Sequence, residues 1–122
     1  MIVDDSAVVR QALMDCIGRM SGIEVLATAN NPVIAADKLK HMVPDVMILD
    51  IEMPQMDGLT FLKLIMEQHP MPVIICSTLT RENSNETMKA LHLGAVGVME
   101  KPDFSSEEKV NEFRIRLSDT IH

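Results

Sequence analysis

The sequence predicts an α/β fold, a doubly wound parallel sheet of five strands in the order 2-1-3-4-5 with a helix after each strand. Short aliphatic runs alternate with longer stretches of helical period along the 122 residues. Three of these runs, 46–49, 73–76 and 96–99, are continuously apolar, which is typical of strands buried on both faces of a parallel sheet. Right-handed crossovers between such strands give the doubly wound order. A chain of this length forms one domain, 1–122.

The strands are expected over residues 1–4, 23–28, 46–50, 73–77 and 96–99. The first of them is short for a central strand, because only Met1, Ile2 and Val3 precede Asp4. We therefore expect either that the N-terminus has been trimmed or that the numbering starts late.

The helices carry start signals. Ser6 can cap a helix over about 7–20, and Asn31 followed by Pro32 opens the second helix. Asp57 precedes the third helix. The last two helices are expected to begin with the capping-box pairs Asn83 with Glu86 and Ser105 with Glu108.

Apolar residues at helical spacing mark the faces that should point to the sheet. These residues are Val9, Leu13, Ile17 and Met20 in the first helix, Ala35, Ala36, Leu39 and Met42 in the second, Phe61, Leu62, Ile65 and Met66 in the third, and Val110, Phe113, Leu117 and Ile121 in the fifth.

The composition excludes several classes of protein. The chain has 18 acidic and 11 basic side chains, a formal charge of −7, and neither Trp nor Tyr, which argues against nucleic-acid binding. No apolar run approaches the length of a membrane span, and no signal peptide opens the chain, so a cytoplasmic protein is expected. Cys16 and Cys76 lie in apolar segments and are expected to be inert buried thiols rather than a disulfide.

Acidic residues follow the first and third expected strands. Asp4 and Asp5 end the first strand, and Asp50 ends the third, with Glu52 close behind. In a doubly wound sheet the carboxyl ends of these strands meet where ligands bind. Converging carboxylates repel one another, so they recruit a cation or raise a pKa. An all-oxygen cluster suits Mg²⁺, or Mn²⁺, better than zinc.

The fourth and fifth strands bring a hydroxyl and an ammonium to the same edge. Ser77 ends the fourth strand, and Lys101 follows the fifth. Carboxylates, a hydroxyl and a lysine suit phosphoryl transfer onto an aspartate, with Asp50 as the nucleophile and Lys101 offsetting the charge of the phosphoryl oxygens. Each feature alone is more often a turn or cap residue. Their occurrence together at one sheet edge favours the functional interpretation.

At this point the sequence resembles the receiver domain of two-component response regulators, over essentially its whole length. The resemblance implies the flavodoxin-like form of the doubly wound fold. The motifs that carry it are Val3-Asp4-Asp5-Ser6, the run 50–58 (D-I-E-M-P-Q-M-D-G), Ser77-Thr78, Leu93-Gly94-Ala95 and Lys101-Pro102.

The resemblance implies a role for each matched residue. Asp50 would be the phosphorylation site, phosphorylated by a histidine kinase. Asp5 and Asp50 would bind Mg²⁺ directly and Asp4 mainly through a water, while Glu52 would contribute its backbone carbonyl. Ser77 would hydrogen-bond the phosphoryl group, and Lys101 would pair with it.

A closer resemblance is to receivers of the chemotaxis protein-glutamate methylesterases, carried by the runs 70–80 and 90–95. It implies a downstream effector domain or chemoreceptor-complex proteins as further partners. The chain has no G-x-S-x-G motif, so the esterase chemistry is not expected in it. We expect a receiver excised from a larger protein, with a standalone single-domain receiver as the alternative.

One position departs from the receiver pattern, because Val98 stands where the family usually carries an aromatic switch residue. Two other functions stay open. A binding module that works without phosphorylation is disfavoured by the complete set of site residues. A metal-dependent phosphatase is disfavoured by Glu52, since such hydrolases commonly carry a second Asp at that position.

Overall fold

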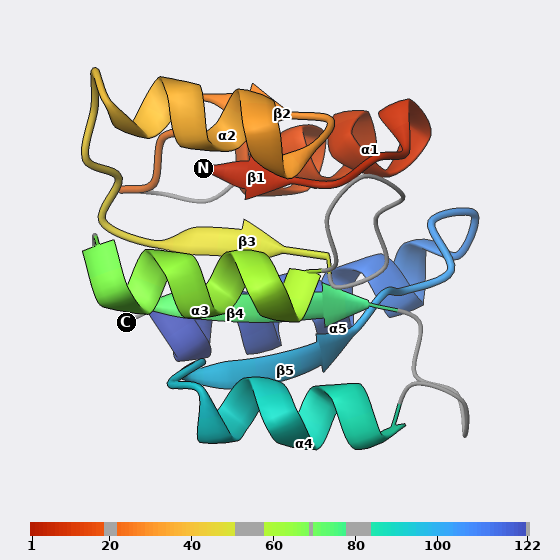
Figure 1. The fold of residues 1–122 in the computed structure, drawn as a ribbon. Coiled ribbons are helices and arrows are strands. Elements are labelled where there is room, and N and C mark those ends of the chain that lie inside the picture. Colours follow the sequence, from red (N-terminus) through yellow and green to blue (C-terminus); the bar gives the residue numbers. More distant parts are fainter. Residues whose placement is uncertain (19–21, 51–57, 69, 78–83, 122) are drawn as a thin grey trace.

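The fold is a five-stranded parallel sheet with helices on both faces, as predicted (Figure 1). The computed structural model describes residues 1–18, 22–50, 58–68, 70–77 and 84–121. The strand order is β2-β1-β3-β4-β5, and every neighbouring pair is parallel. The strands are β1 (Ile2–Val3), β2 (Thr28–Ala29), β3 (Met47–Leu49), β4 (Val73–Ser77) and β5 (Gly97–Glu100). The helices are α1 (Ala7–Gly18), α2 (Pro32–Leu39), α3 (Gly58–Gln68), α4 (Ser84–His92) and α5 (Glu107–Ile121).

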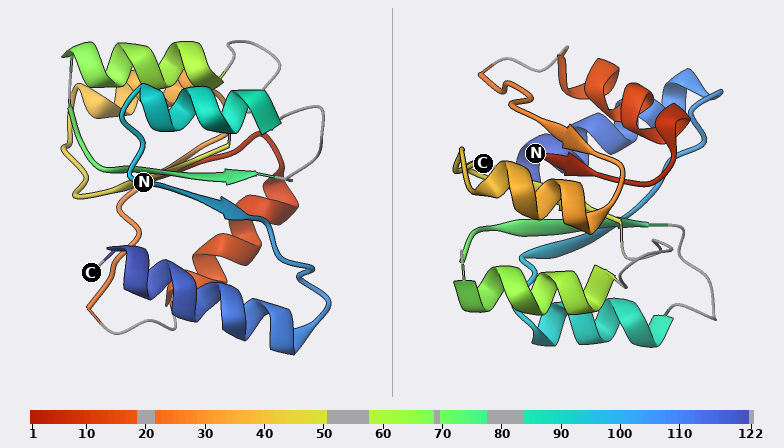
Figure 2. Two further views of the ribbon diagram at one scale, coloured as in Figure 1. Left: turned by 90° about the horizontal axis from the view of Figure 1, so that it is seen from below. Right: turned by 45° about the horizontal axis from the view of Figure 1, so that its top comes forward.

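The sheet separates two helical layers. Figure 2 shows α2, α3 and α4 on one face and α1 and α5 on the other. Alternate residues of the strands supply the two cores: Val3, Leu49 and Ile75 face the first layer, and Ile2 and Ile48 face the second. Both cores exclude water, which explains why β1, β3 and β4 are apolar at every position before Ser77.

The second strand is shorter than the sequence predicted. We expected it over 23–28, but β2 covers only Thr28–Ala29. β2 pairs with β1, whose two residues align with Thr28 and Ala29. The Ile2 amide donates to the Ala27 carbonyl (3.1 Å), but β1 begins at Ile2, so no strand among the described residues lies beside residues 23–26. A strand needs a partner to form its ladder. The other strands lie within one or two residues of their predicted ends.

Two of the predicted caps are confirmed. The Ser6 hydroxyl accepts a hydrogen bond from the Val9 amide at the start of α1 (3.3 Å), and the Asn31 side chain accepts one from the Ile34 amide at the start of α2 (2.9 Å). The cap predicted from Asp57 and the box predicted from Asn83 with Glu86 lie outside the described residues and side chains.

The cap predicted for the last helix is wrong by one residue. Ser106, not Ser105, accepts from the Lys109 amide at the start of α5 (3.3 Å). Ser105 is held instead by Asp103, whose carboxylate accepts from both its amide and its hydroxyl (3.0 and 2.6 Å). This local turn removes Ser105 from the helix.

The predicted inward faces are largely confirmed. Among the residues predicted to face the sheet, Leu13, Ile17, Ala35, Leu39, Phe61, Leu62, Ile65, Phe113 and Leu117 are buried. Ala36 is exposed, because successive residues of a helix point in different directions and the neighbouring Ala35 is the one that faces the sheet. Met20 lies outside the described residues. No helix of the described chain is long and apolar enough to cross a membrane.

Candidate functional site

Two buried carboxylates lie side by side at the carboxyl edge of the sheet. Asp4 follows β1 and Asp50 follows β3, and these strands are neighbours with Val3 aligned with Leu49. The Asp50 amide donates to the Val3 carbonyl (2.9 Å), and the Asp4 amide donates to the Ala29 carbonyl (3.1 Å). The sheet ladder therefore fixes the backbone of both acids, so their carboxylates have little freedom to move apart.

A third carboxylate completes the cluster. One carboxylate oxygen from each of Asp4, Asp5 and Asp50 lies within 4.8 Å of the other two. Asp4 and Asp50 are 1% and 3% exposed, whereas Asp5 is exposed to solvent. The cluster thus has a buried floor and an open side, the arrangement that a hydrated cation needs in order to enter.

Lys101 lies between the two buried carboxylates. Its Nζ is 2.9 Å from Asp4 Oδ2 and 3.1 Å from Asp50 Oδ2. Burial alone would lower the pKa of Lys101, but the hydrogen bond to Asp4 and the negative charge of Asp50 outweigh it, and the pKa is raised above its usual 10.5. Lys101 is therefore a permanent cation at this site at any physiological pH.

Asp4 is also fixed from the side of α1. Its Oδ1 accepts a hydrogen bond from the Ser6 amide (2.8 Å), and its backbone carbonyl accepts one from the Arg10 guanidinium (2.7 Å). The sequence analysis missed Arg10. The signal was present, because Arg10 lies one helical turn after the cap residue Ser6 and so points back to the loop that carries the acids.

Ser77 ends β4 with a buried hydroxyl that has no partner among the described residues. The residue is fully buried, and its Oγ makes no hydrogen bond within the part of the chain that the structure describes. Its carbonyl accepts from the Lys101 amide (3.0 Å), which ties the two residues together. A buried hydroxyl without a partner is costly, so such a group commonly serves a ligand.

The donor set fits a divalent cation. Three carboxylates and one ammonium give a formal charge of −3 + 1 = −2, which Mg²⁺ or Mn²⁺ would neutralise. The ligand atoms that Asp4, Asp5 and Asp50 offer are carboxylate oxygens, the type that these hard cations prefer. Asp4, Asp5 and Asp50 are therefore suited to hold the metal ion that the sequence analysis expected.

The structure brings together five of the six predicted site residues, namely Asp4, Asp5, Asp50, Ser77 and Lys101. Glu52 lies outside the described residues. Val98, at the position of the usual aromatic residue, is half-buried and packs against the core beneath α2, α3 and α4.

The two cysteines are free and buried, as predicted. Burial raises the pKa of the Cys76 thiol to about 12. A thiol that is not ionised is a poor nucleophile, so Cys76 takes no part in the chemistry of this edge although it directly precedes Ser77.

Comparisons with known proteins identify the family of the chain. The sequence model of the response regulator receiver domain matches residues 1–112. A protein-glutamate methylesterase/protein-glutamine glutaminase of Geobacter metallireducens is 50% identical over 121 residues, which are 99% of this chain and 34% of that protein. A methylesterase/glutaminase of Oleidesulfovibrio alaskensis is 46% identical over the same share of this chain. The chain thus spans about a third of the length of these relatives.

Solved structures give the same result. The response regulator domain of Thermotoga maritima CheB has a TM-score of 0.84 and 38% identity, covering 98% of this chain and 90% of that domain. A chain from the complex of the CheA3 P1 domain with CheY6 of R. sphaeroides has a TM-score of 0.81 and 32% identity, covering 99% of this chain and 94% of that one. The chain therefore belongs to the response regulator receiver domain family, and it is similar to the receiver regions of protein-glutamate methylesterases.

Proposed function

We propose that this domain accepts a phosphoryl group on Asp50 in a Mg²⁺-dependent reaction. The observation that carries the proposal is the position of Lys101 between the Asp4 and Asp50 carboxylates, beside a third carboxylate at the open edge of the sheet. A structural ion pair needs one acid for one base. The excess of two negative charges is a cost to folding unless the site serves a cation and a phosphoryl group.

The reaction is a transfer in which one bond to phosphorus forms and one breaks. A carboxylate oxygen of Asp50 attacks the phosphorus of the donor, the bond between phosphorus and the donor atom breaks, and the donor atom leaves with the electron pair of that bond. The product is an acyl phosphate on Asp50. Lys101 would stabilise the negative charge of the phosphoryl oxygens, because its ammonium lies 3.1 Å from the Asp50 oxygen, next to the position that the phosphoryl group would take.

The metal ion, when bound, would draw negative charge from the phosphoryl oxygens during the transfer. Asp4, Asp5 and Asp50 would hold it, together with the backbone carbonyl of Glu52. The ladder bonds of Asp4 and Asp50 and the contact of Arg10 with the Asp4 carbonyl keep these acids in place before the metal arrives.

The buried hydroxyl of Ser77 supports a switching role for the product. Its Oγ has no partner among the described residues, and a phosphoryl group on Asp50 would provide one. A state in which Ser77 and Lys101 both close on the new dianion would then be favoured over the initial state. Val98 leaves no aromatic ring to relocate, so the change would pass through Ser77 and the segment that follows it.

The test is phosphorylation from a small phosphodonor, acetyl phosphate, measured by intact-protein mass. With Mg²⁺, wild type should gain one phosphoryl mass, and Asp50→Asn should gain none. Asp37→Asn is the matched control, because the Asp37 side chain is exposed and lies on α2, outside the acidic cluster. Hydroxylamine should remove the added group, as it cleaves an acyl phosphate but not a phosphoserine at Ser77.

The proposal fails if wild type gains no mass with Mg²⁺, or if Asp50→Asn gains as much as Asp37→Asn. Chelation of the metal should abolish the mass gain in wild type. A gain that is unchanged by chelation would remove the metal from the proposal while keeping Asp50.

We further propose that a histidine kinase is the natural donor and that the domain regulates a chemotaxis methylesterase in the cytoplasm. The support is the identity with methylesterase relatives and the match to a chain from a complex that contains a CheA3 P1 domain. The gene that encodes this chain provides the test. A serine-hydrolase domain encoded downstream in the same reading frame supports the proposal, and a stop codon directly after His122 contradicts it.

A further inference from the structure

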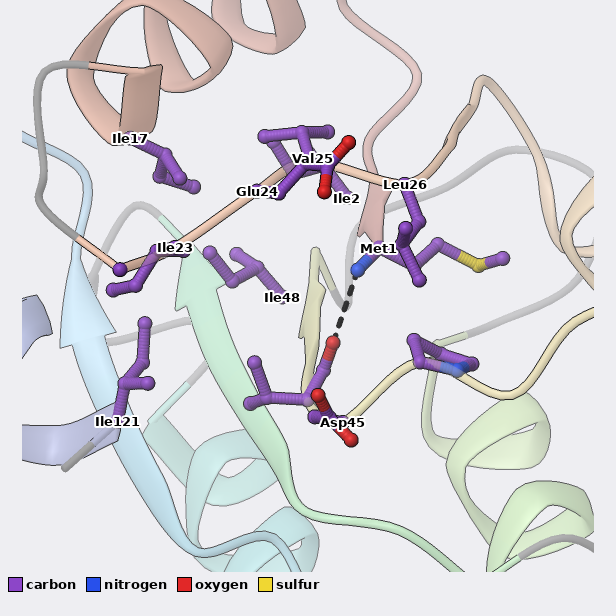
Figure 3. Close-up of a pocket in the computed structure, with 13 residues that line it drawn as sticks. Met1, Ile2, Ile17, Ile23, Glu24, Val25, Leu26, Asp45, Ile48 and Ile121 are labelled. Carbon is purple, nitrogen blue, oxygen red and sulfur yellow. Dashed lines mark hydrogen bonds between the residues drawn. The ribbon is translucent and has the colours of Figure 1, made fainter.

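The backbone of the first strand is held at both ends, but these bonds stop one residue before the third carboxylate of the cluster. At the start of β1 the Met1 ammonium donates to the Val46 carbonyl (3.0 Å; Figure 3). At its end the Asp4 amide donates to the Ala29 carbonyl (3.1 Å). Asp5 follows, and among the described residues no backbone hydrogen bond ties it to the sheet. Other contacts therefore set the direction of the Asp5 carboxylate.

The two peptide groups that flank Asp5 are each held by a side chain. The carbonyl of the peptide between Asp4 and Asp5 accepts a hydrogen bond from the Arg10 guanidinium (2.7 Å). The amide of the peptide between Asp5 and Ser6 donates to the Asp4 carboxylate (2.8 Å). A peptide group is planar, so a bond to its oxygen or its hydrogen restrains the orientation of the whole group. Together the two bonds restrict both backbone dihedral angles of Asp5, and with them the position of its carboxylate.

Arg10 binds a backbone oxygen and not the carboxylates, although it carries a positive charge. Among the described residues it makes no ion pair, and its guanidinium donates to the Asp4 carbonyl. Lys101, by contrast, lies against carboxylate oxygens of Asp4 and Asp50. Arg10 therefore orients the loop that carries the acids while leaving their carboxylate oxygens available to a metal ion.

The base of the Arg10 side chain is fixed by the packing of α1. The Arg10 amide donates to the Ser6 carbonyl (2.9 Å), and the buried Leu13 and Ile17 follow on the same side of the helix, packed in the core beneath α1 and α5. A distance of 2.7 Å to the Asp4 carbonyl is short for a bond from nitrogen to oxygen, as is typical of a charged donor. The planar guanidinium thus connects a packed helix to the loop between the two acids.

We propose that Arg10 is a positioning residue for the metal ion. Through the peptide between Asp4 and Asp5 it holds the Asp5 carboxylate in the cluster, and the affinity for Mg²⁺ depends on this contact. The inference rests on the proposed function, because it takes Asp5 as a ligand of the metal ion. Side chains that hold metal ligands in place typically contribute about 10–100-fold to metal affinity.

The sign of the effect separates positioning from charge. The positive charge of Arg10 repels a cation, so if the guanidinium acted by its charge alone, its removal would raise the affinity for Mg²⁺. If Arg10 acts by holding Asp5, its removal lowers the affinity, because the carboxylate then has to be ordered when the metal ion binds.

The test is a titration with Mg²⁺ alone, followed through the NMR amide signals of the cluster. Arg10→Met should weaken binding at least about tenfold. Arg114→Met is the matched control, because Arg114 is also partly buried and donates to Asn111 (2.8 Å) on α5, outside the cluster. The control should stay within about twofold of wild type, since solvent screens a distant charge. In an Asp5→Asn background, Arg10→Met should change the affinity by less than about twofold, because the ligand that Arg10 holds is already lost.

An affinity of Arg10→Met that equals or exceeds that of wild type would overturn the inference. Equal losses with and without Asp5→Asn would also overturn it, because Arg10 would then not act through Asp5. Arg10→Gln, whose neutral side chain is shorter than arginine, gives the same test if Arg10→Met does not fold. The proposed function is judged separately. If wild type binds no Mg²⁺, both proposals fail, whereas equal binding by wild type and Arg10→Met removes only the role of Arg10.

Discussion

Replacing Lys101 by methionine removes the only cation found between the buried carboxylates of the described site while keeping a similar side-chain length. The Lys101 side chain is 15% exposed, and those of Asp4 and Asp50 are 2% and 3% exposed. Removing one partner of a buried ion pair costs about 3–5 kcal/mol. Because Lys101 keeps some contact with water, we expect the lower end, about 3 kcal/mol.

This cost can be converted into a change of unfolding temperature. The entropy of unfolding near the midpoint is about 2.1 cal/mol/K per residue, so a domain of 122 residues loses roughly 12 °C for about 3 kcal/mol. With Mg²⁺ at saturating concentration the loss should fall to half or less, because the metal ion supplies the positive charge that the variant lacks.

The measurement is thermal unfolding followed by circular dichroism, with and without Mg²⁺. Lys40→Met is the matched control, because Lys40 pairs with Asp37 at 3.9 Å and both side chains are 71% exposed. Such a pair contributes little, so the control should stay within about 2 °C of wild type. The charge argument is refuted if, without Mg²⁺, the unfolding temperature of Lys101→Met equals that of Lys40→Met. It is also refuted if Mg²⁺ does not reduce the difference in unfolding temperature between Lys101→Met and wild type.

Three further predictions follow from single groups. The pKa of the Met1 ammonium is lowered, so between that pKa and 8.0 the unfolded chain binds a proton that the folded chain does not. The unfolding midpoint should therefore rise with pH through this window, and N-terminal acetylation should abolish the rise. Cys16 and Cys76 are buried, and the pKa of Cys76 is raised to about 12, so neither thiol should be labelled by iodoacetamide at neutral pH until the protein is denatured. Intact-protein mass measures the labelling, and a mass gain in the native state would contradict this expectation. Asn31→Ala should lower the free energy of unfolding by about 1 kcal/mol in urea titrations, since it removes the bond to the Ile34 amide, and an unchanged midpoint would mean that the cap contributes nothing.

The strand order and the meeting of Asp4, Asp50 and Lys101 were predictable from the sequence. Strands buried on both faces have a distinctive apolar pattern, and polar residues placed directly after them must share one edge of a parallel sheet. The distances within the cluster were not predictable. They depend on the register of β1 with β3, which aligns Val3 with Leu49 and so makes the two acids direct neighbours.

The errors came from features that depend on a partner or on competing local bonds. Residues 23–27 have the composition of a strand, but their pairing requires a longer β1 than Ile2–Val3. Ser105 fits the sequence pattern of a cap, but its amide donates to the carboxylate of Asp103 instead, and Ser106 caps α5. Composition cannot choose between two adjacent serines, since the choice depends on which turn the backbone has already made.

The order of the strands places Ser77 between the two charged groups of the site. Lys101 follows β5 and Asp50 follows β3, so the end of β4 lies between them, and β3 and β5 are about 10 Å apart. The side chains of Lys101 and Asp50 together span this distance, because Nζ lies 3.1 Å from Asp50 Oδ2. The Lys101 amide also donates to the Ser77 carbonyl (3.0 Å), which fixes the backbone of the lysine at the end of β4. Ser77 therefore brings a buried hydroxyl to the strand end that lies between Lys101 and Asp50, where a phosphoryl group on Asp50 could use it.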